Sequence, residues 1–319
     1  MSVVCSLGDY TGFDFPPLSA NYRIGDKPLG IDVSSKVGVI DYGGEHPSNY
    51  VRGQSTYEYE RLMLQGRILR PYTEKFFRTA GISPGMRVLD LGSGVGDVAL
   101  LVADIVGPGG RVIGLDRDPA ALEWARQRTV DQGCSSWVSF QAANLDDFST
   151  TEQFDAVVGR YILIYQPDAA ATLRQFTRFL KPGGIVVFHE VDFTATMPSF
   201  PPCDLFDQCS SLIAEVFRRV GLSPTFGRQL GKTYLDAGLP FPTVLAEIQT
   251  GGGRGSLLYS WAASTVISLA PRLADLGLSL PPGVVADHSL AARLEEAAVA
   301  QGSQLVASIQ FGAWSRKPL

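Results

Sequence analysis

The sequence predicts an α/β protein built on a doubly wound, mostly parallel sheet. Three observations carry this prediction. Short apolar runs alternate with helical segments through the middle of the chain. These runs are continuously apolar, which is typical of parallel strands buried on both faces. A glycine-rich loop over 90–96 joins the first run to the next helix, and right-handed crossovers then favour an open, doubly wound sheet.

Length and composition fit a protein with a large buried core. The chain has 319 residues, of which 45% are hydrophobic and 18% charged, and its mean hydropathy is +0.09. These values exclude a disordered or fibrous chain. The net charge of −5 argues against a dedicated nucleic-acid binder. The apolar stretch 257–270 is shorter than the roughly 20 residues of a membrane span, so we expect a soluble protein without a membrane partner.

The cysteines favour a reducing compartment. Cys5, Cys134, Cys203 and Cys209 form no CxxC pair, and the chain has only three histidines. We therefore expect free thiols and no zinc site. The N-terminal residues do not combine a basic region with a long apolar run, so we expect no signal peptide and a cytoplasmic location.

The first 54 residues are irregular, although 22–24 and 36–41 are typical of short strands. A helix is predicted to begin at Ser55, because Ser55 and Glu58 form a capping box. Pro71 is expected to kink or split this helix, and Gly81 is expected to end it.

The elements of the sheet follow in a regular order. Asp118 and Pro119 predict the start of a helix, as an N-cap residue followed by proline. Predicted strands cover 87–91, 111–115, 137–142, 154–159, 185–190, 243–248 and 305–316. Predicted helices cover 97–106, 119–132, 168–180, 204–220, 231–237, 256–274 and 289–301, and a turn is expected over 181–184.

The glycine loop and the next strand end point to a ligand. A dinucleotide fingerprint starting at Gly92 would need glycine where Asp97 stands, and an acidic residue there would repel a pyrophosphate. The acidic residues around the loop therefore favour a ligand that carries positive charge. Asp116 ends the second strand, 20 residues after Gly96, where a carboxylate can bind both hydroxyls of a ribose. The alternative is a helix cap, but Asp118 already serves as one.

Four segments in this order resemble the class I S-adenosylmethionine-dependent methyltransferases: VLDLGSGVG, GLD, FDAVVGRYIL and LKPGG. The resemblance covers 82–192 and, less closely, the preceding helix. It implies a seven-stranded, mostly parallel sheet with an antiparallel last strand. We divide the chain into an N-terminal cap segment (1–80), an S-adenosylmethionine-binding core (81–192), and a helical lid with the last strands (193–319).

The resemblance also implies which residues hold S-adenosylmethionine. Gly92 and Gly94 would line its methionine portion, and Asp90 would orient the loop or the amino group. Asn144 would accept a hydrogen bond from the adenine amino group, although a plain turn residue is the alternative. The whole implied set is Tyr50, Arg61, Gln65, Asp90, Gly92, Ser93, Gly94, Asp116, Arg117, Asn144, Leu145, Arg160 and Tyr161.

The cap helix carries its own alternatives. Arg61 and Gln65 lie four residues apart, on one face of the helix. Arg61 would clamp the carboxylate of the cofactor, or it belongs to a solvated helix face. Tyr50 would close over the cofactor, with packing as the alternative.

The implied reaction is methyl transfer by in-line displacement, which requires an aligned nucleophile and a site that excludes water. We expect no metal, because Gly159, Arg160 and Tyr161 stand where catechol-type relatives need acidic residues. His189 and Glu190 are the candidate general bases. A buried, hydrogen-bonded His189 is the alternative, as is transfer by proximity without any base. His46 and His288 are weaker candidates.

The acceptor is expected to be a small hydrophobic or aromatic molecule, as in secondary metabolism, methylated on O, N or C. The alternatives are an RNA or protein methyltransferase, and a protein that binds S-adenosylmethionine without transferring the methyl group. A homodimer is left open. Residues expected in the acceptor pocket, with lid packing as the alternative, are Phe193, Met197, Phe200, Phe206, Tyr234, Tyr259 and Trp261.

Overall fold

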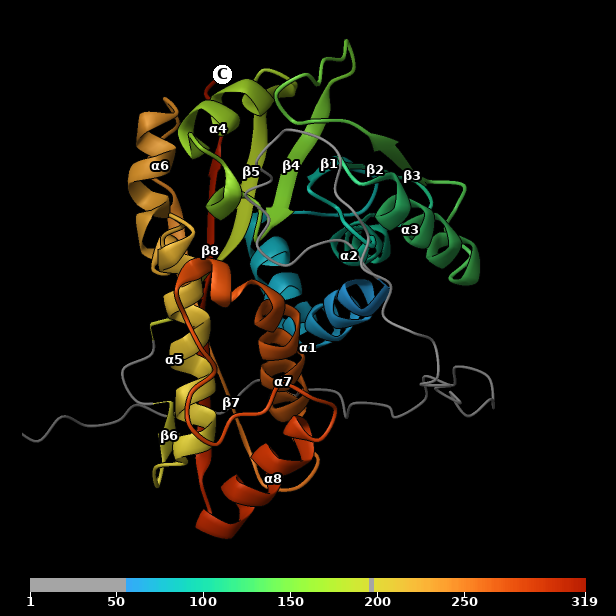
Figure 1. Cartoon of the computed structure of the whole chain (residues 1–319). Helices are drawn as coiled ribbons and strands as arrows, with labels where there is room; N and C mark the ends of the chain where they lie inside the picture. Colours follow the sequence, from blue (N-terminus) through green and yellow to red (C-terminus); the bar gives the residue numbers. More distant parts are fainter. Residues whose placement is uncertain (1–55, 195–197) are drawn as a thin grey trace, which may run out of the picture. The chain divides into compact units, whose positions relative to one another are not determined.

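In the computed structural model, residues 56–194 and 198–319 are described, and they form a mixed sheet with helices on both faces (Figure 1). Several predictions lie outside the described residues: the short strands near 22–24 and 36–41, the Ser55 cap, and any role of Tyr50, His46 or Met197.

The sheet has the strand order β3-β2-β1-β4-β5-β8-β6, and β7 pairs with β8. The neighbours from β3 to β5 are parallel, whereas β8 is antiparallel to β5, β6 and β7. The predicted doubly wound sheet with an antiparallel last strand is confirmed. Among the described residues it has eight strands instead of seven, because the two-residue β6 was not predicted. The strands are β1 (Arg87–Leu91), β2 (Arg111–Asp116), β3 (Val138–Ala142), β4 (Phe154–Arg160), β5 (Leu180–Asp192), β6 (Ser199–Phe200), β7 (Thr243–Gly252) and β8 (Gln304–Arg316).

Strand β5 is longer than predicted, and the turn expected over 181–184 lies within it. Leu180 already pairs with Phe154 on β4, and after a shift of register Ile185 pairs with Ala156. The prediction of a separate turn was wrong, because the intervening residues form an irregularity in the strand and do not end it. The preceding helix is correspondingly shorter than predicted.

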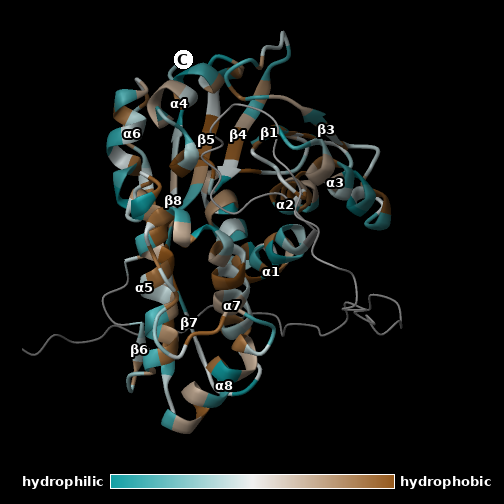
Figure 2. Ribbon diagram, viewed as in Figure 1, coloured by the Kyte–Doolittle hydropathy of each residue, from teal (hydrophilic) through white to brown (hydrophobic). Residues whose placement is uncertain are grey.

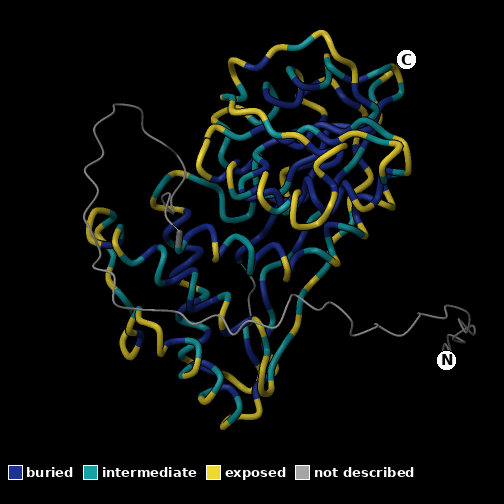
Figure 3. The backbone as a smooth tube through the Cα atoms, turned by 90° about the vertical axis from the view of Figure 1, so that its right-hand side faces the viewer, coloured by how far each residue is buried: buried dark blue, intermediate teal, exposed yellow. Residues whose placement is uncertain are grey.

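Alternate residues of the central strands feed two different cores. Val88 and Val112 pack in a cluster with α1 and α2 on one face of the sheet, while Leu89 and Leu115 pack with the lid helices on the other. This is the side-chain alternation of a strand buried on both faces. Figure 2 shows the apolar character of β4 and β5, and Figure 3 shows buried residues in the interior and exposed residues on the outer turns.

Helix α1 continues through Pro71, contrary to the predicted split. Pro71 is exposed, as is Arg67 four residues earlier, whose carbonyl loses its usual helical donor. Water can satisfy that carbonyl on the solvent side of the helix. None of the described helices is long and apolar enough to span a membrane. The helices are α1 (Thr56–Ala80), α2 (Asp97–Val106), α3 (Pro119–Asp131), η1 (Leu163–Tyr165), α4 (Ala169–Thr177), α5 (Asp204–Arg219), η2 (Phe226–Gln229), α6 (Leu230–Asp236), α7 (Leu257–Leu269), η3 (Ala270–Arg272), η4 (Ala274–Leu276) and α8 (Leu290–Gln301).

Candidate active site

The loop between β1 and α2 is bent by glycines with positive φ. The angle is +65° at Gly92 and +51° at Gly94, a region that residues with a side chain rarely adopt. A Cβ on Gly92 would lie 2.5 Å from Cδ1 of Ile162. A Cβ on Gly94 would meet no atom of the described residues within 4 Å. The loop is therefore tightly covered at Gly92 and open at Gly94.

Asp116, at the end of β2, is tied to this loop. Its Oδ2 accepts a hydrogen bond from the Gly94 N–H at 2.8 Å, and its Oδ1 accepts one from the Asp118 N–H at 2.9 Å. Burial raises the pKa of Asp116, although these two N–H groups oppose the rise. Asp118 caps α3 through the Ala120 N–H, as predicted. Arg117 lies between the two aspartates and is exposed.

Two buried side chains beside the loop have no hydrogen-bond partner among the described residues. Asp90 is 0% exposed, and neither of its carboxylate oxygens is paired. Burial raises its pKa well above the ordinary range, and the positive charge of the Arg160 guanidinium opposes the rise. The buried hydroxyl of Ser93 is also unpaired. Each such atom costs on the order of 1–3 kcal/mol, so a ligand that supplied donors here would be bound favourably.

Asn144 follows β3 at the same edge of the sheet as Asp116. The register pairs Asp116 with Ala142, two residues before Asn144. Asn144 is exposed, and its Nδ2 lies 3.4 Å from Oδ2 of Asp147. Leu145 is partly buried against the main core cluster. The structure thus brings the predicted ribose and adenine contacts to one edge.

Arg160, at the end of β4, is brought to the start of α2. Its side chain is 7% exposed, and its Nη2 lies 3.8 Å from Oδ2 of Asp97. Its Nη1 donates to Oγ1 of Thr73 at 3.4 Å. Burial lowers the pKa of Arg160, and Asp97 opposes the change. The next residue, Tyr161, has a φ of +54°, a conformation that is unusual outside glycine.

Arg61 is part of a buried polar cluster between α1 and α7. Its guanidinium donates to both carboxylate oxygens of Glu58, at 2.8 and 2.6 Å, and to Oε1 of Gln65 at 3.0 Å. The same carboxylate accepts a hydrogen bond from the Ser268 hydroxyl at 2.8 Å. Arg61 is 2% exposed and Gln65 is 5% exposed, so the alternative of a solvated helix face is wrong.

His189 is buried, and both of its ring nitrogens are engaged. Nδ1 lies 2.9 Å from Oγ1 of Thr73, and Nε2 lies 2.9 Å from Oε1 of Gln310. Burial, together with the positive charge of Arg160, lowers the pKa of His189 to about 3. This geometry is that of the buried, hydrogen-bonded histidine that was left open as an alternative. A role of His189 as general base stays a prediction.

Glu190 points to the opposite face of β5. Its Oε1 accepts hydrogen bonds from the N–H groups of Ile162 and Leu163, at 3.0 and 2.8 Å. Its Oε2 is buried without a partner among the described residues. Burial raises the pKa of Glu190 to about 8, against these backbone donors. Glu190 therefore holds its proton near neutral pH while it fixes the loop after β4, and its role as a base stays a prediction.

Comparison of the sequence with known proteins shows which family the chain belongs to. A family model for a methyltransferase domain matches residues 82–220. The aklanonic acid methyltransferase of a Streptomyces species is 31% identical over 151 residues, which cover 47% of this chain and 67% of that protein. The chain belongs to the class I S-adenosylmethionine-dependent methyltransferases.

Two further relatives match over a smaller share of their own length. The 2-phytyl-1,4-naphtoquinone methyltransferase of Synechococcus elongatus is 42% identical over 101 residues, 31% of this chain and 43% of that protein. An uncharacterized 37.1 kDa protein in transposon TN4556 of Streptomyces fradiae is 30% identical over 183 residues, 55% of this chain and 50% of that protein. The chain thus spans about half the length of these two relatives.

We expected seven residues in the acceptor pocket, and most of them lie in the hydrophobic core of the protein. Phe193, Phe206, Tyr234 and Tyr259 are buried in one hydrophobic cluster, and Trp261 packs against it. Lid packing, the alternative left open, accounts for these residues. Phe200 is instead 69% exposed.

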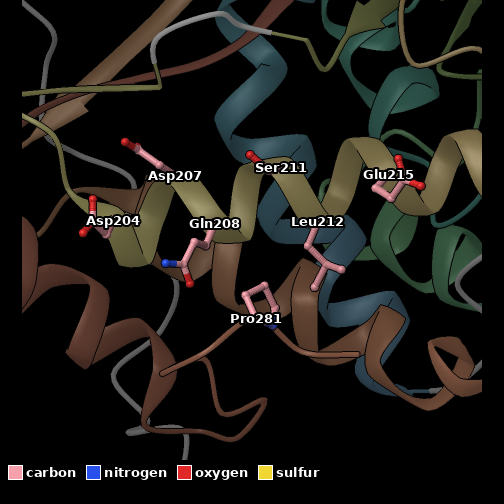
Figure 4. A pocket seen from close by; sticks show the side chains of 7 residues that line it. All are labelled: Asp204, Asp207, Gln208, Ser211, Leu212, Glu215 and Pro281. Carbon is pink, nitrogen blue, oxygen red and sulfur yellow. The ribbon is translucent and has the colours of Figure 1, made fainter. Parts of the chain in front are cut away.

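Two hollows lie beside the helices, one along α5 and one next to α7, and neither is lined by residues of the glycine loop. A groove of about 380 Å³ runs along α5 (Figure 4). A pocket of about 230 Å³ lies between α1, α7 and α8. The groove is lined by Asp204, Asp207, Gln208, Ser211, Leu212, Glu215 and Pro281. The pocket is lined by Tyr57, Glu60, Arg61, Leu64, Ser260, Ala263, Ser264, Ile267, His288 and Ala291.

Sequence reasoning missed two residues that contact His189, Thr73 and Gln310. Gln310 is 2% exposed in β8. A buried amide needs partners, so a glutamine in the run SIQFGAW was a usable signal. Thr73 lies in α1 and also bonds to the Leu69 carbonyl at 3.0 Å. That bond is common for helical threonine, so no local pattern singled Thr73 out.

Proposed function

We propose that this chain transfers a methyl group from S-adenosylmethionine to an O, N or C atom of a small, hydrophobic or aromatic acceptor, without a metal. The observation that carries the proposal is the pair of unpartnered, buried side chains Asp90 and Ser93. They lie beside the open backbone at Gly94, on the loop to which Asp116 is bonded. S-adenosylmethionine has the positive charge and the hydrogen-bond donors that would satisfy them.

The residues around the loop fit the two ends of this cofactor. Asp116 would accept hydrogen bonds from the ribose hydroxyls, since each carboxylate oxygen can accept more than the one bond it makes here. Asn144 would accept from the adenine amino group, with Arg117 and Leu145 beside it. At the other end, the ammonium group would complete the hydrogen bonding of Asp90.

The remaining predicted contacts belong to the methionine end. Gly92, Gly94 and Ser93 would line it, next to Arg160 and Tyr161. Arg61 and Gln65 belong to the same proposal, although the charge of Arg61 is matched by Glu58. When bound, S-adenosylmethionine supplies a methyl group on a positively charged sulfur.

The chain's own residues would act mainly by position. Near neutral pH, the low pKa of His189 keeps its ring neutral and the raised pKa of Glu190 keeps its carboxyl protonated. Neither group then offers a free, basic lone pair to an acceptor. Transfer by proximity, in a site closed to water by the lid helices, is therefore favoured over transfer that depends on either residue as a base.

The relatives support a small acceptor. One is named for a naphthoquinone that carries a phytyl chain and another for aklanonic acid, and both acceptors are small molecules. An RNA methyltransferase is less compatible with a net charge of −5. Binding of the cofactor without methyl transfer is the second alternative. A cytoplasmic location and a homodimer stay parts of the proposal.

A two-step experiment tests the proposal. Calorimetric titration with S-adenosyl-L-homocysteine should first give saturable binding. Incubation with methyl-labelled S-adenosylmethionine and a panel of reduced quinones and hydroxylated polycyclic aromatics should then label at least one acceptor. If the product binds but no acceptor in the panel or in a small-molecule extract is labelled, the chain is a binding protein and the transferase proposal fails.

A further inference from the structure

Tyr161 has an unusual backbone conformation, and hydrogen bonds fix both its backbone and its side chain. Its φ is +54°, a region that residues with a side chain rarely adopt without support from the surrounding structure. Its N–H donates to the His189 carbonyl at 2.9 Å. Its hydroxyl donates to Oε1 of Gln310 on β8. The ring of Tyr161 also meets the His189 ring edge to face, with 5.6 Å between the centroids.

The orientation of the Gln310 amide follows from its partners. Its Nε2 donates to the Ser308 carbonyl at 2.9 Å, so Oε1 faces both Tyr161 and His189. Exchanging the two amide atoms would place Oε1 against the Ser308 carbonyl oxygen, and neither of these oxygens has a hydrogen to donate. Oε1 can only accept, so the Tyr161 hydroxyl and the His189 Nε2 must both be donors.

These hydrogen bonds select one tautomer of His189. With the hydrogen on Nε2, Nδ1 is an acceptor for the Thr73 hydroxyl at 2.9 Å. The Leu69 carbonyl, 3.0 Å from the same hydroxyl, competes for its hydrogen. Thr73 in turn accepts from Arg160 at 3.4 Å. The ring thus donates to Gln310 through Nε2 and lies within hydrogen-bond distance of Thr73 through Nδ1, so it links α1 to β8.

Tyr161 also controls what covers the glycine loop. It is followed by Ile162, whose Cδ1 would lie 2.5 Å from a Cβ placed on Gly92. A change in the backbone at Tyr161 would therefore move the side chain that lies directly over Gly92. The hydrogen bonds that fix Tyr161 consequently fix the surface of the loop.

We propose that Gln310 and His189 are positioning residues that hold Tyr161 against the methionine end of S-adenosylmethionine. This inference rests on the proposed function, since it requires that end of the cofactor to lie at Gly92. Gln310 acts here only through Tyr161, because its amide is engaged by Tyr161, His189 and Ser308.

The test compares two ligands by calorimetric titration of the full chain. S-adenosyl-L-homocysteine carries the amino-acid end, whereas 5′-methylthioadenosine lacks it. Tyr161→Phe and Gln310→Leu should each weaken binding of S-adenosyl-L-homocysteine about fivefold to twentyfold, the scale of a lost hydrogen bond or two. Both should leave 5′-methylthioadenosine within about twofold. The double variant should be no weaker than the poorer single variant, because both remove the same link.

Ser315→Ala is the matched control, since it removes a buried hydroxyl of the same strand that has no partner among the described residues. It should change neither affinity. If the wild-type chain binds neither ligand, the proposed function and this inference both fall. If it binds both but Tyr161→Phe keeps full affinity, or loses both ligands equally, only the positioning role is wrong. Should Gln310→Leu fail to fold, Tyr161→Phe alone decides.

Discussion

Two groups of buried polar side chains in this molecule are arranged in opposite ways. Beside the glycine loop, Asp90 and Ser93 have no partners among the described residues. Next to Tyr161, the side chains of His189 and Gln310 are paired at every polar atom that the neutral forms offer. Unpaired buried groups cost stability, whereas paired ones fix geometry. The group of Asp90 and Ser93 is therefore suited to binding a ligand, whereas the group of His189 and Gln310 is suited to fixing the geometry of the site.

The largest effect is expected at another paired cluster, that of Arg61. Arg61→Ala would leave Glu58 buried without its cation, and the free energy of unfolding should fall by about 3–5 kcal/mol. Urea denaturation measures this loss. A loss below 1 kcal/mol would mean that the buried pair does not hold α1 to the rest of the chain.

The double variant Glu58→Gln/Arg61→Met separates structure from ligand binding at this cluster. It removes both charges, so it should recover most of the lost stability. If Arg61 also clamps the cofactor, S-adenosyl-L-homocysteine should still bind more weakly to the double variant. Recovery of both stability and affinity would make the cluster purely structural.

The second effect concerns the cofactor edge. Asp116→Ala should weaken binding of S-adenosyl-L-homocysteine by roughly 1.5–3 kcal/mol, the scale of lost charge-assisted hydrogen bonds. Calorimetry measures the change, with Asp146→Ala as the control because Asp146 is an exposed acidic residue. Unchanged affinity of the Asp116 variant would remove this residue from the proposed site and weaken the contrast drawn above.

The sheet and the glycine loop could be predicted because their signals are local. Apolar runs give β1 and β4 within one residue of the observed bounds, and the short spacing of Gly92, Gly94 and Asp116 brings them together across neighbouring strands. The full length of β5 could not be predicted, because it depends on the pairing of Leu180 with β4 and on the backbone bonds of Gly183 and Gly184 to Lys317, just after β8.

The paired groups were harder to predict because their partners are distant in sequence. His189 meets Thr73 and Gln310, which lie 116 and 121 residues away. The apolar run 185–190 placed His189 on the correct strand, and alternation separated its face from that of Glu190. Neither signal could say whether the ring nitrogens would be hydrogen-bonded. For Arg61, the partner Glu58 lies at helical spacing and was open to prediction, whereas the Ser268 contact depends on how α7 packs.

A third prediction uses pH to probe the end of β5. Burial raises the pKa of Glu190 from 4.5 to about 8, so the folded chain binds this proton more tightly than the unfolded chain. The resulting stabilisation is complete below pH 4.5 and is lost as pH rises through about 8. Between about pH 6.5 and pH 9, unfolding free energy should fall by about 2 kcal/mol more in the wild type than in Glu190→Gln. Parallel curves for the two proteins would show that Glu190 is ionised throughout.

The pKa of His189 is shifted in the opposite direction from that of Glu190, so the two residues affect stability in different pH ranges. Its pKa is lowered from 6.5 to about 3, so its contribution is intact above pH 6.5 and is lost as pH falls toward 3. The His189 effect is therefore confined to the acid side, and the Glu190→Gln comparison above pH 6.5 is free of it.

The smallest effect is expected for Ser93→Ala, which tests directly whether the unpaired buried side chains beside the glycine loop bind a ligand. The Ser93 hydroxyl has no partner to lose among the described residues, so Ser93→Ala should change the unfolding free energy by less than about 0.5 kcal/mol. It should nevertheless weaken S-adenosyl-L-homocysteine about twofold to tenfold, if the ligand supplies the missing hydrogen bond. Thr73→Val should show the reverse pattern, a clear loss of stability with a smaller change in affinity, because Thr73 already has its partners. If Ser93→Ala destabilised the free protein while leaving affinity intact, the unpaired atoms would mark no binding site.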